Sequence, residues 1–168
     1  MFSGLVWSPD GTKIAASYFM GCRQCRYELY IADMTPYVYD SNPSPTFENN
    51  PNLGQITDSV GGIGGAFDWS PDSESIVFTQ LQSQYDGTGA IYVADLDENG
   101  INFRWLANGF SPKFFPEEEK IAFSKWSEED LQERYHKDKS TPEIFTMNAD
   151  GTNIISTGQY GYLIAVKP

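Results

Sequence analysis

The 168-residue sequence predicts an all-β protein, and three observations lead to that fold class. Short apolar segments alternate with turns rich in Pro, Asp, Gly and Ser, as is typical of strands joined by tight turns. One unit of four such segments recurs along the chain in three versions. Aromatic residues make up 15% of the sequence, as expected where stacked sheets pack large side chains between them. The sequence therefore predicts a β-propeller of four-stranded antiparallel blades, with about three blades present.

The first turn of the unit is its best-preserved feature. It reads Trp-Ser-Pro-Asp from Trp7 and from Trp69, and Phe-Phe-Pro-Glu from Phe114. Proline fixes its own φ and lacks an N–H, so it ends the first strand, and Asp and Ser suit the turn that follows. The later strands are expected at 13–17, 28–33 and 54–58, at 75–79, 90–94 and 102–107, and at 120–124, 143–151 and 153–158.

We expect one partial propeller domain over 1–168. Its predicted parts are blade one at about 1–58, blade two at about 63–107, blade three at about 110–158, and the start of a further strand at 160–168. A closed propeller typically has about four to eight blades, so three cannot close a ring. The chain is therefore expected to be a fragment of a longer propeller, or to be completed by a second copy or another subunit.

The repeated motif also resembles a known family. The segment WSPDG, followed by IA and then by LYIAD or IFTMNADGTN, resembles the repeat of TolB-like β-propeller proteins, which is also found in propeller domains of prolyl-oligopeptidase-type peptidases. The resemblance covers nearly the whole chain, although the third unit has Phe for Trp and Glu117-Glu118 for Asp-Gly. It implies a protein-interaction scaffold in an extracytoplasmic compartment, periplasmic or extracellular, although the sequence shows no signal peptide.

Charge and hydropathy limit the partners. The formal net charge of −12 argues against nucleic acid and anionic membrane surfaces, which Lys and Arg patches bind. No apolar run approaches the roughly 20 residues that span a bilayer. We therefore expect a protein partner, or further blades from another chain or copy, with no cofactor. The many aromatic residues are compatible with a sugar ligand, but the sequence shows no specific small-molecule site.

Cys22 and Cys25 lie in the loop after the second strand of blade one. A zinc site needs four ligands, and the sequence offers one Cys pair and one distant His. Haem attachment requires C-x-x-C-H, but Arg26 follows the second cysteine. A loop disulfide and two free thiols remain, and the extracytoplasmic location that the family resemblance implies favours the disulfide.

Asp95, Asp97 and Asn99 have the opening spacing of a calcium loop, D-x-D-x-N-G. The twelfth position of that loop requires Glu and holds Leu106, and strands rather than helices are expected on both sides. A similar Asn-Ala-Asp-Gly segment, 148–151, stands at the equivalent place in blade three. The sequence therefore indicates a hairpin turn, with calcium only a weak candidate.

Loops between second and third strands share one face of a propeller with the blade-to-blade connections. On that face we expect the loops at 20–26 and 82–89, a short helix at 127–137, and the glycine-rich connection 61–65, which passes close to the propeller axis. Variable loops on a rigid scaffold carry function, so this face is the candidate interaction face. Its candidate residues are Gly62, Gly64, Tyr85, Trp126, Tyr135 and His136.

The sequence predicts no enzyme. A serine hydrolase needs the nucleophile elbow G-x-S-x-G, and the nearest segment, 109–113, lacks the second Gly. A Walker loop and the HExxH metalloprotease motif are also missing. We therefore expect a scaffold for protein–protein interaction or a structural subunit. The alternative is the substrate-gating propeller of a prolyl-oligopeptidase-type serine peptidase whose catalytic domain is absent from this chain.

Overall fold

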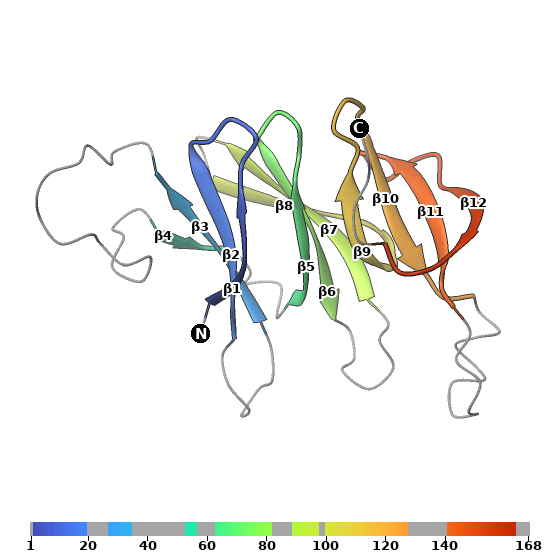
Figure 1. Ribbon diagram of the computed structural model, residues 1–168. Helices are drawn as coiled ribbons and strands as arrows, with labels where there is room; N and C mark the ends of the chain where they lie inside the picture. Colours follow the sequence, from blue (N-terminus) through green and yellow to red (C-terminus); the bar gives the residue numbers. More distant parts are fainter. Residues whose placement is uncertain are drawn as a thin grey trace, which may run out of the picture.

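The computed structural model describes residues 2–19, 27–34, 53–56, 63–81, 89–97, 100–127 and 141–163. These residues form twelve strands and no helix. The strands make three consecutive antiparallel groups of four, which we call blades one, two and three (Figure 1). The short helix expected at 127–137 lies outside the described residues, apart from Ser127.

The strands follow one another in chain order within each blade. Blade one comprises β1 (Phe2–Trp7), β2 (Lys13–Phe19), β3 (Tyr27–Asp33) and β4 (Leu53–Gln55). Blade two comprises β5 (Ile63–Trp69), β6 (Ser75–Leu81), β7 (Gly89–Asp97) and β8 (Gly100–Asn108). Blade three comprises β9 (Phe110–Phe114), β10 (Lys120–Lys125), β11 (Glu143–Asn148) and β12 (Ile155–Tyr160). The strand β5 contacts both β1 and β9, so the first strands of the blades lie together.

The glycine-rich connection corrects the sequence prediction. Part of it, from Ile63 onward, is the start of β5 rather than a loop, because Ile63 pairs with Gln80 of β6 and with Tyr27 of β3. The pairing with Tyr27 joins blades one and two into a single eight-stranded sheet, whereas blade three forms its own four-stranded sheet. Glycine has no side chain, so it allows neighbouring strands to approach this closely.

The Ser-Pro-Asp turns use their polar atoms internally. In blade one the Ser8 hydroxyl donates to Asp10 Oδ1 at 2.6 Å and accepts from the Lys13 N–H at 2.9 Å. Ser70 repeats both contacts in blade two, with Asp72 and the Ser75 N–H. Hydrogen bonds from Ser8 and from the main chain of the turn lower the pKa of Asp10 to about 2. The repeated motif therefore stabilises turns and leaves little for a ligand.

Two apolar clusters hold the blades together. Between blades one and two, Phe67, Trp69 and Phe78 pack against Ala15 and Leu29. The Trp69 indole also donates a hydrogen bond to the Val6 carbonyl at 3.1 Å, which ties blade two to the first strand of blade one. The second cluster lies between blades two and three, and its buried members are Val77, Ile91, Val93, Leu106, Ala107, Phe114, Ile121, Phe123 and Met147.

The junction of blades two and three has different polar contacts from the first junction. Phe114 stands there at the position of Trp69, and the phenylalanine side chain has no N–H to donate. The Lys113 ammonium donates to the Phe67 carbonyl at 3.2 Å and lies 3.5 Å from Asp68 Oδ1. Asp68 also accepts from the Phe114 N–H at 3.0 Å, and burial raises the pKa of its carboxyl. The connection here is tight, since a Cβ on Gly109 would lie 2.7 Å from Cδ2 of the Phe123 ring.

Candidate functional site

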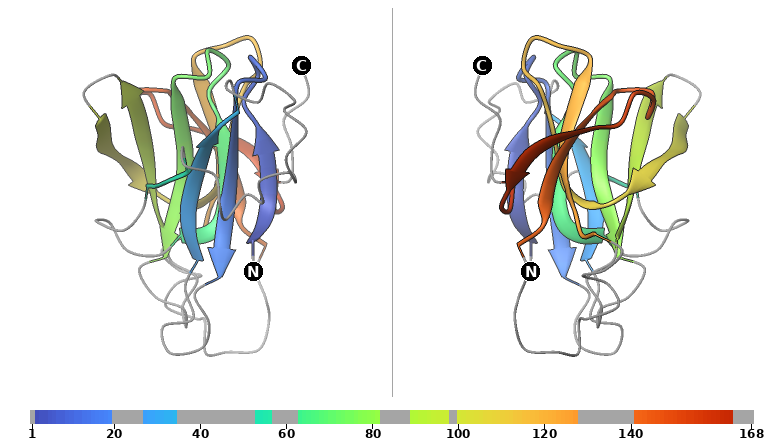
Figure 2. Two further views of the ribbon diagram at one scale, coloured as in Figure 1. Left: turned by 90° about the vertical axis from the view of Figure 1, so that its left-hand side faces the viewer. Right: turned by 90° about the vertical axis from the view of Figure 1, so that its right-hand side faces the viewer.

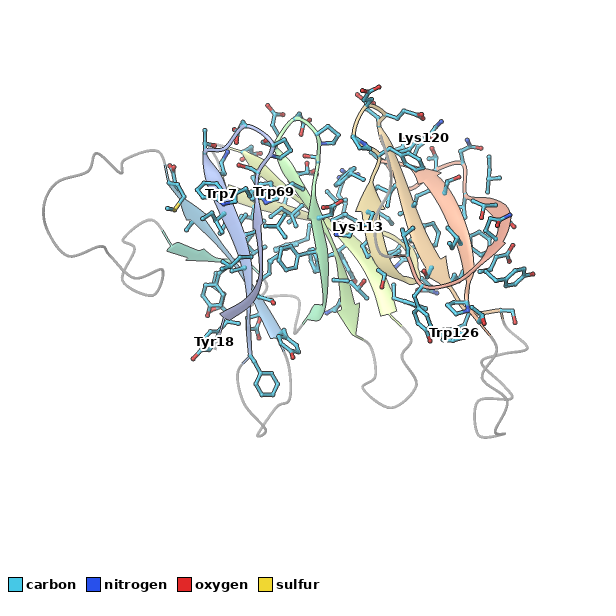
Figure 3. The ribbon with its side chains drawn as sticks, in the orientation of Figure 1. Trp7, Tyr18, Trp69, Lys113, Lys120 and Trp126 are labelled. Atoms are coloured by element: carbon cyan, nitrogen blue, oxygen red, sulfur yellow. The ribbon has the colours of Figure 1, made fainter. Side chains whose placement is uncertain are left out.

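The candidate interaction face is only partly described. Gly64 lies in β5 and Trp126 directly follows β10. Figure 3 places Trp126 at the end of the blades opposite to the Ser-Pro-Asp turns, as expected for this face. The predicted residues outside the described part of the chain are Cys22, Cys25, Gly62, Tyr85, Asn99, Tyr135 and His136.

Trp126 belongs to an aromatic cluster that the sequence did not indicate. Its ring centroid lies 5.8 Å from that of Phe110 and 6.1 Å from that of Tyr162, and the latter two are 6.1 Å apart. Phe110 begins β9, and Tyr162 follows β12, so three separate elements meet here. Phe110 and Tyr162 each come directly after a glycine that follows the last strand of a blade. This repeated glycine-aromatic pair is the sequence signal that could have revealed the cluster.

The weak calcium candidates make contacts within the protein. Asp95 accepts hydrogen bonds from the Ser75 hydroxyl at 2.9 Å and from Arg104 Nε at 2.7 Å, and the Arg104 contact is the main cause of its lowered pKa. Asp97 accepts from the Asn102 amide at 3.1 Å. Among the described residues no three His, Cys, Asp or Glu side chains group as metal ligands would. The calcium interpretation therefore remains an untested prediction.

A cleft of about 440 Å³ opens between blades two and three beside their first turns. Its charged lining consists of Arg104 and four acidic residues, Asp72, Glu117, Glu118 and Glu119. Glu118 pairs with Lys120 at 2.6 Å in an exposed ion pair. The cleft lies on the side opposite to the candidate interaction face, and sequence reasoning missed it because the two turns that line it are 45 positions apart in the repeat.

Blade one presents an open face. Trp7 and Leu5 are 56% and 63% exposed, whereas their counterparts in blade two, Trp69 and Phe67, are both 4% exposed. The two side views in Figure 2 each place a terminal blade in front, blade one in one view and blade three in the other. Trp69 is covered by the preceding blade, and no described residue covers Trp7 in the same way (Figure 3).

The side of blade three that points away from blade two is partly exposed. Ala122, Ile144 and Thr146 alternate along their strands with residues of the second apolar cluster, so they point away from blade two. Ala122 is buried at this position, whereas Ile144 and Thr146 are partly exposed. Ile155 is directly opposite Thr146 in the strand register and is 52% exposed. In blade two the equivalent residues Val77, Ile91 and Val93 are buried under blade three. We call these two surfaces the Trp7 face and the far face of blade three.

The end of blade three repeats the connection that follows blade two. The Gly161 N–H donates to the Pro142 carbonyl at 2.8 Å, as Gly109 donates to Gly89 at 2.9 Å. The Leu163 N–H donates to the Ser124 hydroxyl at 3.1 Å, as Ser111 donates to Thr79 at 3.1 Å. Residues 161–163 thus follow the path by which the chain reaches the first strand of a blade. The further strand itself remains a prediction, because residues 164–168 lie outside the described part.

Comparison with solved structures identifies the fold. A TolB structure from Agrobacterium tumefaciens matches with a TM-score of 0.58 and 20% identity over 89% of this chain. The β-propeller domain of the Trilobed protease from Pyrococcus furiosus, described as having an open velcro topology, matches at 0.59 and 15% identity over 92%. A chain of a nidogen/laminin complex matches at 0.54 and 16% identity over 95%.

These similarities establish a structural resemblance to TolB-like and protease β-propeller domains. The matched regions cover 46%, 40% and 49% of the three chains, so this chain spans less than half of their lengths. Neither a scan against protein-family models nor a search of curated proteins finds a match. The resemblance at this low identity concerns the fold alone.

Proposed function

We propose that this chain is a non-enzymatic β-propeller scaffold for protein–protein interaction, within a larger extracytoplasmic assembly. The observation that carries the proposal is the contrast between Trp7, at 56% exposed, and its structural counterpart Trp69, at 4%. In blades two and three the equivalent face is buried in apolar contact with the preceding blade, whereas in blade one it is exposed. Large apolar side chains that are exposed here, but buried at the equivalent places of another blade, favour a protein-interaction surface.

The repeat itself supports this assignment. Its best-preserved polar side chains, in the Ser-Pro-Asp turns, are hydrogen-bonded within the turns. The aromatic cluster of Phe110, Trp126 and Tyr162 offers a second contact surface, because aromatic side chains are enriched at the centres of protein interfaces. The matched chain from a nidogen/laminin complex belongs to a protein assembly, in keeping with a scaffold role.

The experiment compares the self-association of three proteins: the unaltered chain, Trp7→Ser and Trp105→Ser. Trp105 is the matched control because it is also 56% exposed but lies on the outer strand β8. We expect the unaltered chain to associate as its concentration rises, Trp7→Ser to associate less, and Trp105→Ser to behave like the unaltered chain. Equal behaviour of all three, measured by light scattering after size exclusion, would refute an interaction role for the Trp7 face.

The alternative function is the substrate-gating propeller of a serine peptidase, favoured by the match to the Trilobed protease propeller. That function requires a catalytic domain from outside this sequence. It predicts that a hydrolase domain docks on one end of the blades and leaves the Trp7 face to other blades. Hydroxyl-radical footprinting of the longer protein, with and without its hydrolase domain, would distinguish the two, since only the alternative protects Phe110 and Tyr162 in a hydrolase-dependent way.

A further inference from the structure

The cleft between blades two and three is an apolar groove. Its apolar lining consists of Pro71, Val93, Phe114, Pro116 and Ala149. Val93 and Phe114 are 1% and 7% exposed and belong to the second apolar cluster, so the cleft reaches down to the core of this junction. Its volume of about 440 Å³ falls within the range of about 300–1,000 Å³ that is typical of ligand pockets.

The corresponding turns of blades one and two are in direct contact. The Asp10 N–H donates to the Ser73 hydroxyl at 3.1 Å, and Ser73 is buried. Blade three has Glu118 at the position of Ser73, and this exposed side chain pairs with Lys120 of its own blade. Figure 1 shows the turns that precede β6 and β10 at the same end of the blades, and the cleft lies between them. The cleft therefore lies where the repeat exchanges a small residue that bonds to the neighbouring turn for a charged one that pairs within its own blade.

The rim of the cleft is acidic, and most of its negative charge is uncompensated. Asp72, Glu117 and Glu119 form no ion pair with any other residue in the described part of the chain. The basic residue of the lining, Arg104, donates to both carboxylate oxygens of Asp95, at 2.7 Å from Nε and at 3.2 Å from Nη2. Because Asp95 lies outside the lining, it neutralises Arg104 without reducing the charge of the rim.

We propose that this cleft binds a basic segment of a partner protein, in which a Lys or Arg side chain is flanked by an apolar residue. Lys and Arg lay their aliphatic stems along apolar surface and keep the charged group at a polar edge, which matches the apolar lining and the acidic rim. The net charge of −12 also attracts a basic partner from a distance. The proposal goes beyond the scaffold function, because it concerns a surface other than the Trp7 face and gives the chemistry of its partner.

A metal ion fits the described residues less well than a basic side chain. Ca²⁺ takes about six to eight oxygen ligands, which must converge on one point. Among the residues that the structure describes, no three His, Cys, Asp or Glu side chains group in this way. Carboxylates spread along the rim of an apolar groove suit a larger cation, whose stem and neighbouring residues fill the groove.

The test begins with peptide binding, measured by isothermal titration calorimetry on the unaltered chain. The probe is the peptide Gly-Ser-Leu-Arg-Leu-Lys-Leu-Gly-Ser, acetylated and amidated at its ends. One matched peptide has Glu at both basic positions, and the other has Ser at every Leu position. We expect the probe to bind, the acidic peptide not to bind, and the peptide without Leu to bind more weakly than the probe. Absence of binding by the probe would overturn the proposal.

Two double variants locate the site. Glu117→Gln with Glu119→Gln removes two exposed carboxylates of the rim, and Glu74→Gln with Asp97→Asn removes two exposed carboxylates outside the lining. We expect the rim variant to bind the probe about three- to tenfold more weakly than the unaltered chain, because exposed charge pairs are individually weak. The control variant should stay within about twofold of the unaltered chain. Far-UV circular dichroism checks that both variants fold.

Other outcomes would overturn the proposal or separate it from the scaffold function. An equal loss of binding in the two double variants would mean that binding follows overall charge and not the cleft. Displacement of the probe by calcium chloride, beyond the effect of sodium chloride at equal ionic strength, would indicate a metal site instead. Trp7→Ser should bind the probe as the unaltered chain does. Self-association through the Trp7 face without probe binding would therefore refute the cleft site alone, and probe binding without self-association would refute only the role of the Trp7 face.

Discussion

Substitution of Trp69 tests how the blades are held together. Its indole is 4% exposed, packs in the cluster between blades one and two, and donates to the Val6 carbonyl. Replacing a buried aromatic side chain with alanine typically costs about 3–5 kcal/mol, and the hydrogen bond accounts for about 1 kcal/mol of such a loss. We therefore expect Trp69→Ala to lower the free energy of unfolding by about 3–5 kcal/mol, a large share of the roughly 5–15 kcal/mol typical of a native protein.

The assay is urea unfolding followed by far-UV circular dichroism, which does not depend on tryptophan fluorescence. Trp105→Ala is the control, because it removes an indole from the same blade at a position 56% exposed. We expect it to cost less than about 1 kcal/mol, as for most surface substitutions. Trp69→Phe keeps an aromatic ring and removes the donor, so its cost should fall between the two. Equal costs for Trp69→Ala and Trp105→Ala would refute the assigned role of the blade-one to blade-two junction.

Three further predictions concern the turns, the connections and the surface. Asp10→Asn should lower Tm at pH 7, and the difference in Tm between the two proteins should vanish below about pH 2. The reason is that a carboxyl whose pKa falls to about 2 on folding stabilises the protein only above that pH. A difference in Tm that persists below about pH 2 would contradict this. Gly109→Ala should cost about 1–3 kcal/mol in urea unfolding, since its Cβ would meet a buried phenylalanine ring at 2.7 Å, whereas Gly54→Ala, with nothing nearer than 4.0 Å, should be nearly neutral. Arg104→Ala should cost only about 0.2–1 kcal/mol, and less in high salt, because its ion pair with Asp95 is partly exposed; a larger, salt-independent cost would argue against a surface pair.

The local chemistry of the repeat was predictable from the sequence. The Ser-Pro-Asp turns fall between the expected strands in blades one and two because Ser, Pro and Asp act through neighbouring residues. The Asn148–Gly151 turn closes as expected, with the Gly151 N–H donating to the Asn148 carbonyl at 2.9 Å. All three signals lie within a few residues of the contacts that they make.

Contacts between residues far apart in the sequence were not predictable. The hydrogen bond from Lys113 to the Phe67 carbonyl and the ring contact of Trp126 with Tyr162 join residues far apart in sequence. No local sequence pattern encodes either contact. The start of β5 at Ile63 was missed for the same reason, since its pairing with Tyr27 crosses from one blade to the next. The strand pattern thus followed from local chemistry, whereas the candidate surfaces depend on how the blades stack.

The central claim is that the Trp7 face is a protein-interaction surface. The most direct test is the solution mass of the purified chain across a range of concentrations, measured by light scattering after size exclusion. We predict species heavier than the 18.8 kDa chain, in a proportion that rises with concentration. A stable, well-folded species of single mass at all concentrations would contradict the claim.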